Sequence, residues 1–161
     1  MFVIRKALST DQEAIWQISK EVISTGDTYT FAPDASREEL LSFWFGKDKH
    51  TYVVVEKNEV LGMCLIKPNQ PGLGSHIANA AYMVSDKAEG QGIGKALCLF
   101  SLDEAKQLGF QAMQFNIVIK SNDRAVKLWQ KLGFQIIGEI PEAFNHKQLG
   151  LTNAYIMYRK L

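Results

Sequence analysis

The stretch EGQGIGK, residues 89–95, indicates the fold of this chain more directly than any other segment. Its three alternating glycines stand between an expected strand, His76–Val84, and an expected long helix, Gly92–Leu108. Glycine lets a ligand approach the backbone closely, and a helix N-terminus offers unpaired N–H groups and the positive end of a dipole. The stretch therefore predicts an anion-binding loop between strand and helix, with a phosphate or pyrophosphate as the bound group.

The two common nucleotide-binding motifs do not fit this loop. A Walker A loop needs glycine at position 89 and serine or threonine at 96, where the chain has Glu89 and Ala96. A dinucleotide fingerprint needs a small residue at position 97, where the chain has Leu97. The phosphate-bearing ligand is therefore expected to belong to another class.

Outward from this loop, short turns divide the chain into strands and helices. Runs of β-branched and apolar residues predict strands, and polar caps before helically spaced apolar residues predict helices. The other expected strands are Met1–Ala7, Thr51–Lys57, Val60–Lys67, Met113–Lys120, Phe134–Ile140 and Ala154–Arg159. The other helices are expected to follow caps at Ser9 or Thr10, at Ser36 and at Asn122, and Pro141–Asn153 is expected to be a loop.

This order of elements predicts an α+β fold with a mixed sheet. Only Asn58-Glu59 separates the strands Thr51–Lys57 and Val60–Lys67, so these form an antiparallel hairpin. The strand–helix–strand passage through the glycine loop needs a right-handed crossover between parallel neighbours. We expect a twisted sheet of about seven strands flanked by about four helices, in one domain over residues 1–161.

Composition excludes several classes of function. Eighteen basic and seventeen acidic residues leave a net charge of +1, without the basic excess of a nucleic-acid binder. No apolar run approaches the roughly 20 residues that a membrane helix needs. Cys64 and Cys98 sit in apolar runs, which indicates reduced core residues and a cytoplasmic protein. The histidines and cysteines have no ligand-like spacing, so no metal is expected.

Two motifs resemble those of the GNAT superfamily of acyl-CoA N-acyltransferases. One runs from Tyr82-Met83-Val84-Ser85 to Gly92-Ile93-Gly94-Lys95-Ala96-Leu97, and the other is the N-x-x-A…K-L-G-F segment Asn122–Phe134. The element order also matches the family over essentially the whole chain. The resemblance implies that two central parallel strands, His76–Ser85 and Met113–Lys120, splay apart around the acyl-CoA.

The resemblance also implies where acetyl-CoA binds as the co-substrate. The backbone of Met83 and Val84 is expected to contact the pantetheine arm, and Asn122 to touch that arm or cap its helix. The residues expected at the pyrophosphate are Gln91, Gly92, Ile93, Gly94 and Lys95. Glu89 replaces the usual arginine or glutamine of the motif, and we expect it to point to solvent because an acid repels a pyrophosphate.

Trp129 occupies the position where many members of the family have a tyrosine that acts as general acid. An indole donates a hydrogen bond but does not release its proton at useful pH. We therefore expect Trp129 beside the acyl-carrying sulfur, without proton delivery to the leaving thiolate.

The acceptor site is expected to contain two asparagines. Asn79 and Asn116 are polar residues in apolar stretches of the two strands that splay, and one of them is predicted to hold the amine or an ordered water. The pair resembles a branch of the family that acetylates small amino and imino acids, in which asparagines replace an ionisable base. The family also implies that Tyr29 and Phe31 line the acceptor pocket.

Three titratable residues are further candidates near the acceptor. His76 stands at a strand start and is a weaker candidate for the base. Glu142 and His146, in the expected loop Pro141–Asn153, are predicted to close over the acceptor.

The sequence therefore predicts an acetyl-CoA-dependent N-acetyltransferase that acts on the primary or secondary amine of a small metabolite, such as an amino acid. A protein amine acetyltransferase is one alternative. Another is a non-catalytic acyl-CoA sensor, to which Glu89 and Trp129 point. A homodimer is common in the family, although nothing in the residues demands one.

Overall fold

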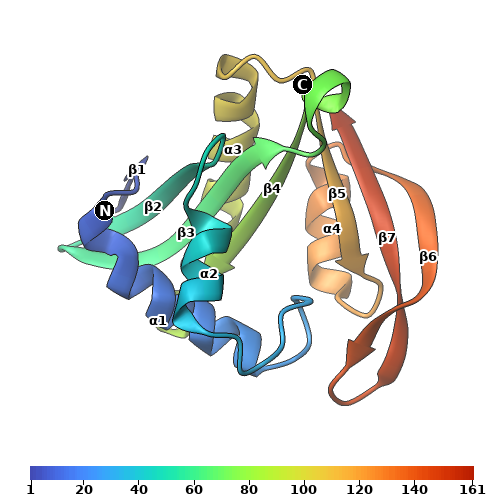
Figure 1. Cartoon of the computed structure of the whole chain (residues 1–161), viewed down its shortest axis with the longest axis horizontal. Helices are drawn as coiled ribbons and strands as arrows, with labels where there is room; N and C mark the ends of the chain where they lie inside the picture. Colours follow the sequence, from blue (N-terminus) through green and yellow to red (C-terminus); the bar gives the residue numbers. More distant parts are fainter.

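Seven strands form one open sheet in the order β1-β2-β3-β4-β5-β7-β6 in the computed structural model, which describes all 161 residues (Figure 1). The strands are β1 (Val3–Lys6), β2 (His50–Glu56), β3 (Glu59–Pro68), β4 (Ile77–Val84), β5 (Ala112–Ile119), β6 (Gln135–His146) and β7 (Gly150–Lys160). The helices are α1 (Gln12–Ser24), α2 (Arg37–Trp44), α3 (Ile93–Gln107) and α4 (Asp123–Lys131). The mixed α+β architecture predicted from the sequence is confirmed.

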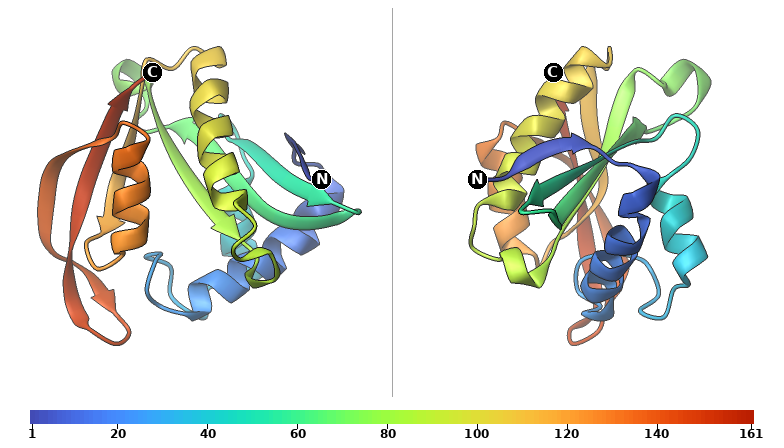
Figure 2. Two further views of the ribbon diagram at one scale, coloured as in Figure 1. Left: turned by 180° about the vertical axis from the view of Figure 1, so that it is seen from behind. Right: turned by 90° about the vertical axis from the view of Figure 1, so that its left-hand side faces the viewer.

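The helices cover both faces of the sheet. Helices α1 and α2 lie on one face, and α3 and α4 lie on the other, which faces the viewer when the molecule is seen from behind (Figure 2). The period of two in β4 divides the core accordingly: Ala81 and Met83 pack with α1 and α2, whereas Tyr82 and Val84 pack with α3. None of the helices has the length and hydropathy needed to cross a bilayer.

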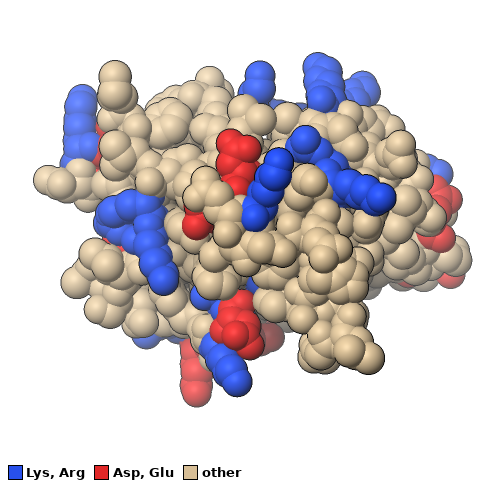
Figure 3. All heavy atoms as spheres, turned by 90° about the horizontal axis from the view of Figure 1, so that it is seen from above, with Lys and Arg blue, Asp and Glu red and all other residues tan.

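Charge is unevenly spread over the surface. The end of the molecule that carries the α2–β2 and β3–β4 loops is seen from above in Figure 3, where basic side chains are more prominent than acidic ones.

The β2–β3 hairpin forms as predicted, with its turn one residue earlier. Glu56 pairs with Glu59, so Lys57 and Asn58 make the two-residue turn, with φ of 50° and 64°. Positive φ at both positions matches the twist of the flanking strands.

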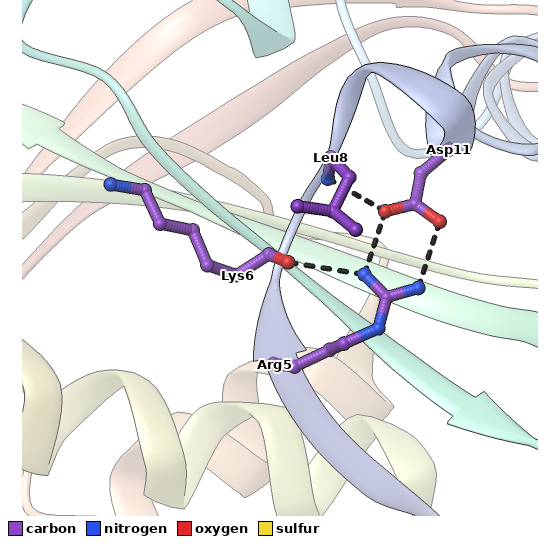
Figure 4. Close-up of polar contacts among 4 residues, drawn as sticks. All are labelled: Arg5, Lys6, Leu8 and Asp11. Atoms are coloured by element: carbon purple, nitrogen blue, oxygen red, sulfur yellow. Dashed lines mark hydrogen bonds and ion pairs between the residues drawn. The ribbon is translucent and has the colours of Figure 1, made fainter.

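The start of α1 differs from the prediction that Ser9 or Thr10 caps the helix. These residues instead lie in a 3-10 turn, Ser9–Asp11, ahead of α1. Asp11 accepts hydrogen bonds from the Leu8 N–H at 2.7 Å and from both terminal nitrogens of Arg5, at 2.7 and 3.0 Å (Figure 4). A bidentate arginine is a stronger partner for this carboxylate than a helix terminus, so the ion pair decides the geometry.

The prediction of a loop over Pro141–Asn153 is wrong, because most of this segment belongs to a long β6–β7 hairpin. Pro141 lies in the bulge of the edge strand β6, between the paired residues Ile140 and Phe144, so its missing N–H removes no ladder bond. A register shift between Ile140 and Phe144 accommodates Glu142, whose φ is 51°. The turn comprises only residues 147–149, closed by the Gln148 and Leu149 N–H groups, which donate to His146 Nδ1 at 3.1 Å.

Strands β4 and β5 diverge after two pairs of residues. Ile77 pairs with Ala112 and Ala78 with Met113 in parallel register, and no further pairing follows. The two strands separate toward the end of the molecule opposite the C-terminus (Figure 1). This is the splay that the family resemblance implies.

Candidate active site

The splay opens into a cavity of about 530 Å³. Its walls come from β4, β5, the first turns of α3 and α4, and the loop between α1 and α2. The predicted site residues that line it are Tyr29, Asn79, Met83, Val84, Gly94, Asn116, Asn122 and Trp129. Most of the lining is apolar, as in small-molecule sites where a few polar groups set orientation.

The remaining predicted residues lie beside this cavity. Phe31 packs edge-on against Phe43, with ring centroids 4.9 Å apart, and Phe43 lines the cavity. Ile93 is buried in the core of the α3 face. Gln91, Gly92 and Lys95 lie at the N-terminal end of α3.

The N-terminus of α3 has the geometry of an anion site. Gly92 is the N-cap with φ 76°, and no side chain caps the helix. The first helical hydrogen bond runs from Ala96 N–H to Gly92 O at 3.0 Å, so the N–H groups of the first turn are free to bind a ligand. A Cβ added at Gly90 or Gly92 would meet no atom within 4 Å, which shows open space before the helix.

Glu89 points to solvent, with 76% of its side chain exposed. Its nearest basic partner is Arg124 in the first turn of α4, at 3.9 Å across the mouth of the splay. A contact this exposed contributes little to stability.

Strand β4 turns unpaired backbone groups toward the splay. Asn69 N–H donates to Ile77 O at 2.8 Å, and Ser85 N–H donates to Leu61 O at 2.9 Å, so odd-numbered residues make the bonds to β3. Hydrogen-bonded and non-hydrogen-bonded pairs alternate along an antiparallel ladder. The N–H and C=O groups of even-numbered residues, including Val84, therefore face away from β3, whereas those of Met83 pair with β3.

The Tyr29 hydroxyl is hydrogen-bonded to the backbone of one of these even-numbered residues, Tyr82. It accepts the Tyr82 N–H at 3.0 Å and donates to the Tyr82 carbonyl oxygen. Burial raises the pKa of Tyr29, so the hydroxyl is neutral. The Tyr82 N–H is thus paired within the protein, and its bond to the Tyr29 hydroxyl shows that a β4 backbone N–H facing the splay can donate to an oxygen.

An aromatic wall closes the α4 side of the cavity. The Trp129 ring lies 5.1 Å from that of Tyr82 and 4.3 Å from that of Phe115, between centroids. Burial raises the pKa of Tyr82, so its hydroxyl is protonated at neutral pH, and it lies within 2.6 Å of Ser101 Oγ. The Trp129 indole N–H makes no hydrogen bond within the protein, which leaves it free to donate to a ligand.

The two predicted asparagines take part in a network of amides. Asn79 Nδ2 donates to the Gln114 carbonyl at 2.9 Å, which ties β4 to β5 just where the strands part. Asn116 Nδ2 donates to Asn69 Oδ1 at 2.7 Å, and Asn116 Oδ1 accepts from Gln114 Nε2 at 3.0 Å. Sequence reasoning missed Asn69 and Gln114, although the spacing of two between Gln114 and Asn116 places them on one face of β5.

None of the three titratable candidates lines the cavity. His76 is exposed and precedes β4 at its paired end. Glu142 is exposed at the β6 bulge, and the His146 imidazole closes the hairpin turn instead of covering an acceptor.

The tip of the β6–β7 hairpin touches the α1–α2 loop. Lys147 N–H donates to Gly26 O at 3.1 Å. Gly26 has φ 65°, and a Cβ there would lie 3.0 Å from Lys147 Cβ. This close approach joins the two halves of the sheet across the open end of the splay.

Cys98 is the one thiol in the cavity wall, and it is free and buried. Burial raises the pKa of this thiol to about 12. A neutral thiol is a poor nucleophile at physiological pH. The cavity is therefore better suited to direct transfer between two bound molecules than to an intermediate on cysteine.

Comparisons with known proteins agree with this geometry. The chain matches the model of the acetyltransferase (GNAT) family over residues 13–134. It is 32% identical over 151 residues to the N-acetyltransferase aca1 of Schizosaccharomyces pombe, covering 83% of this chain and 72% of that protein.

Solved structures are also similar. A GCN5-related N-acetyltransferase from Kribbella flavida aligns with a TM-score of 0.93 and 41% identity, over 99% of this chain and 98% of that chain. A phosphinothricin acetyltransferase from Sinorhizobium meliloti, solved in complex with AcCoA, aligns with a TM-score of 0.86 and 22% identity, over 99% and 88% of the two chains. The second likeness is one of fold.

Proposed function

Because the chain belongs to the GNAT family of acetyltransferases, we propose that it transfers the acetyl group of acetyl-CoA to the primary or secondary amine of a small metabolite. Membership of the family makes the chain an N-acetyltransferase that uses acetyl-CoA as donor. We propose in addition that the acceptor is small, and we assign roles to individual residues.

The residues present fit acetyl-CoA. The free N–H groups from Gly92 to Lys95 would hold the pyrophosphate at the positive end of the α3 dipole, in the space that a Cβ at Gly92 would enter. The backbone of Val84 would bind the pantetheine arm, and Met83 borders the same cavity. Asn122 caps α4, since its Oδ1 accepts the Ala125 N–H at 3.3 Å, and its side chain also lines the cavity.

The coenzyme supplies an activated acetyl thioester. In the transfer, the amine nitrogen bonds to the carbonyl carbon, the carbon–sulfur bond breaks, the thiolate leaves and the new amide nitrogen loses a proton. A backbone N–H that faces the splay, such as that of Val84, would stabilise charge on the carbonyl oxygen. Trp129 would contact the sulfur with its indole N–H.

The titratable side chains in the cavity wall are Tyr29, Tyr82 and Cys98, and burial raises the pKa of each. None of them is a base at neutral pH. Asn79 and Asn116 would therefore position the neutral amine, or a water that takes its proton, without taking the proton themselves.

One observation carries the proposal of a small acceptor. The hydrogen bond between Lys147 and Gly26 spans the open end of the splay, where a through-going groove would run. An extended peptide needs such a groove. Tyr29 and the aromatic pair Phe31 and Phe43 narrow the same opening from the α1–α2 side.

Thiol release from acetyl-CoA across a panel of amino acids, polyamines and peptides tests the proposal. We expect turnover with small amines. Turnover confined to peptides or proteins would overturn the small-acceptor proposal, and no turnover with any amine would favour an acyl-CoA sensor.

The free and buried cysteines Cys64 and Cys98 support a reducing compartment such as the cytoplasm. A homodimer stays a prediction from the family. The molar mass in solution, measured by sedimentation at several protein concentrations, tests it.

A further inference from the structure

A second depression, of about 640 Å³, lies beside the splay cavity. It is formed by the α2–β2 loop, the end of β3 and the β3–β4 loop, on the end of the molecule where basic side chains are prominent (Figure 3). Its lining includes Lys47, Lys49 and Lys67, and Asp48 is its one acidic residue. The depression therefore has an excess of positive charge.

Lys67 lies at the border between the depression and the splay cavity. Its ammonium is 5.5 Å from the ring centroid of Phe43, which lines the splay cavity. Lys67 also pairs with Asn79 across the β3–β4 ladder, on the face that carries α1 and α2. Directly opposed, hydrogen-bonded residues have Cα atoms about 5.5 Å apart. The lysine and the candidate amine-binding asparagine are thus close neighbours.

A second contact joins the two spaces. Asn69 lines the basic depression, and its Oδ1 accepts a hydrogen bond from Asn116 Nδ2, which borders the splay cavity. A small molecule in the splay therefore has the basic depression directly next to it.

The charges of Lys49 and Lys67 are not neutralised by the protein. Lys49 donates to the Ser42 carbonyl oxygen near the end of α2, and neither lysine has a carboxylate within 4.0 Å. Burial and the charge of Lys67 together lower the pKa of Lys49. Two neighbouring cations without an acidic partner form a site that gains from an added anion.

We propose that Lys67, supported by Lys49, binds an oxyanion of the acceptor, so that the preferred amine carries a carboxylate or a phosphate. This rests on the proposed function, because it assumes that the amine lies in the splay near Asn79. Lys67 is then a specificity-determining residue, which holds the far end of the acceptor while the amine faces the acetyl group.

The competing explanation is that Lys67 only covers an aromatic ring. The chain offers a matched control for this: Lys20 lies over Trp16, with its ammonium 5.4 Å from the ring centroid, and borders neither space. Lys20→Gln removes the same charge and the same cation–π contact at a remote place. Lys67→Arg keeps the charge.

The experiment measures kcat and KM with a panel of amino acids, their carboxamides, phosphoethanolamine, its phosphate-free counterpart ethanolamine, and spermidine. Each is assayed with wild type, Lys67→Gln, Lys67→Arg and Lys20→Gln. For the best oxyanion-bearing acceptor, kcat/KM is expected to fall at least about tenfold in Lys67→Gln, mainly through KM, which is the scale of a lost hydrogen bond to a charged group.

The neutral counterpart of that acceptor is expected to change less than about threefold in Lys67→Gln, within the scatter of surface substitutions. Lys67→Arg is expected to retain the preference, and Lys20→Gln to match wild type, with an unchanged KM for acetyl-CoA in all variants. The ratio of kcat/KM in the variant to kcat/KM in wild type is compared for each acceptor, so the different basicities of an amino acid and its amide cancel. Whether carboxylate or phosphate is the better oxyanion follows from the same panel.

Two outcomes would overturn this inference and leave the proposed function intact. One is a best acceptor without an oxyanion. The other is an equal preference for the oxyanion in wild type and Lys67→Gln. Absence of turnover with every small amine would overturn both proposals together.

Discussion

Replacing Gly92 by alanine tests the coenzyme site most directly. Gly92 caps α3 with φ 76°, and a Cβ added there would enter open space with no atom within 4 Å. The substitution is therefore expected to cost stability only through its left-handed backbone, by about 1–2 kcal/mol. For a chain of this size that lowers Tm by roughly 2–8 °C, and the protein stays folded.

The same Cβ would enter the space where the pyrophosphate is expected. Loss of one hydrogen bond to a charged group weakens binding by about 1.5–3 kcal/mol, or roughly 10–150-fold. At a ligand concentration of about 100 Kd, acetyl-CoA stabilises wild type by about 2.7 kcal/mol, or roughly 5–11 °C in Tm. If binding is weakened a hundredfold, the same concentration of acetyl-CoA stabilises the variant by only about 0.4 kcal/mol, or roughly 1–2 °C in Tm.

Thermal unfolding with and without acetyl-CoA measures both effects, and Gly109→Ala is the matched control. Gly109 follows the other end of α3 with φ 92°, and a Cβ added there would also meet no atom within 4 Å. We expect Gly109→Ala to lower Tm by a similar amount and to keep its full acetyl-CoA shift. If Gly92→Ala lowers Tm but keeps the full acetyl-CoA shift, the pyrophosphate does not bind at this turn.

Three further predictions concern the aromatic wall, the amides and the Arg5 ion pair. Trp129→Phe is expected to retain most turnover, since no proton passes through the indole; a loss beyond roughly 100-fold in kcat, with acetyl-CoA binding intact, would give the indole a chemical role. Asn79→Ala and Asn116→Ala are each expected to lower kcat/KM for the acceptor by at least about tenfold, or roughly 1.4 kcal/mol, with acetyl-CoA affinity little changed; a lower Tm with normal kinetics at both positions would exclude an amide-lined acceptor site. The hydrogen bonds from Arg5 hold the pKa of Asp11 below its ordinary value, so the folded state binds this proton less readily than the unfolded state. The stabilisation from this ion pair is full above about pH 4 and is lost as pH falls through the folded pKa. Asp11→Asn should lower the free energy of unfolding at pH 7 by about 1–3 kcal/mol and reduce its fall at acid pH, measured by urea unfolding over a series of pH values. An unchanged fall at acid pH would contradict this.

Several local features of the fold and the site were predictable from the sequence. The glycine loop, the helix that follows it and the cap at Asn122 all depend on residues within a few positions of one another. Ser36 Oγ likewise accepts the Glu39 N–H at 3.1 Å, as its spacing predicts. Such contacts are made within one turn of chain, so the residue types at fixed spacing are sufficient to indicate them.

The predictions from local sequence were wrong where contacts with other parts of the chain decided the structure. Pro141 and the polar residues after it are typical of a loop, yet the edge position of β6 tolerates proline and the bulge accommodates Glu142. Ser9 and Thr10 are typical caps, but Asp11 is held by Arg5 from the neighbouring strand.

The sequence by itself determined the α+β order, the glycine loop before α3 and the residue types at the splay. Only the tertiary structure decided that the Tyr29 hydroxyl reaches the Tyr82 backbone and that the Lys147 amide closes on Gly26. It also decided that Lys67 stands beside Asn79 with no acidic partner. These contacts join residues far apart in the chain, so they depend on strand order, register and the paths of loops. A helical period or a cap acts over a few residues and carries no such information, because many chain paths satisfy the same local pattern.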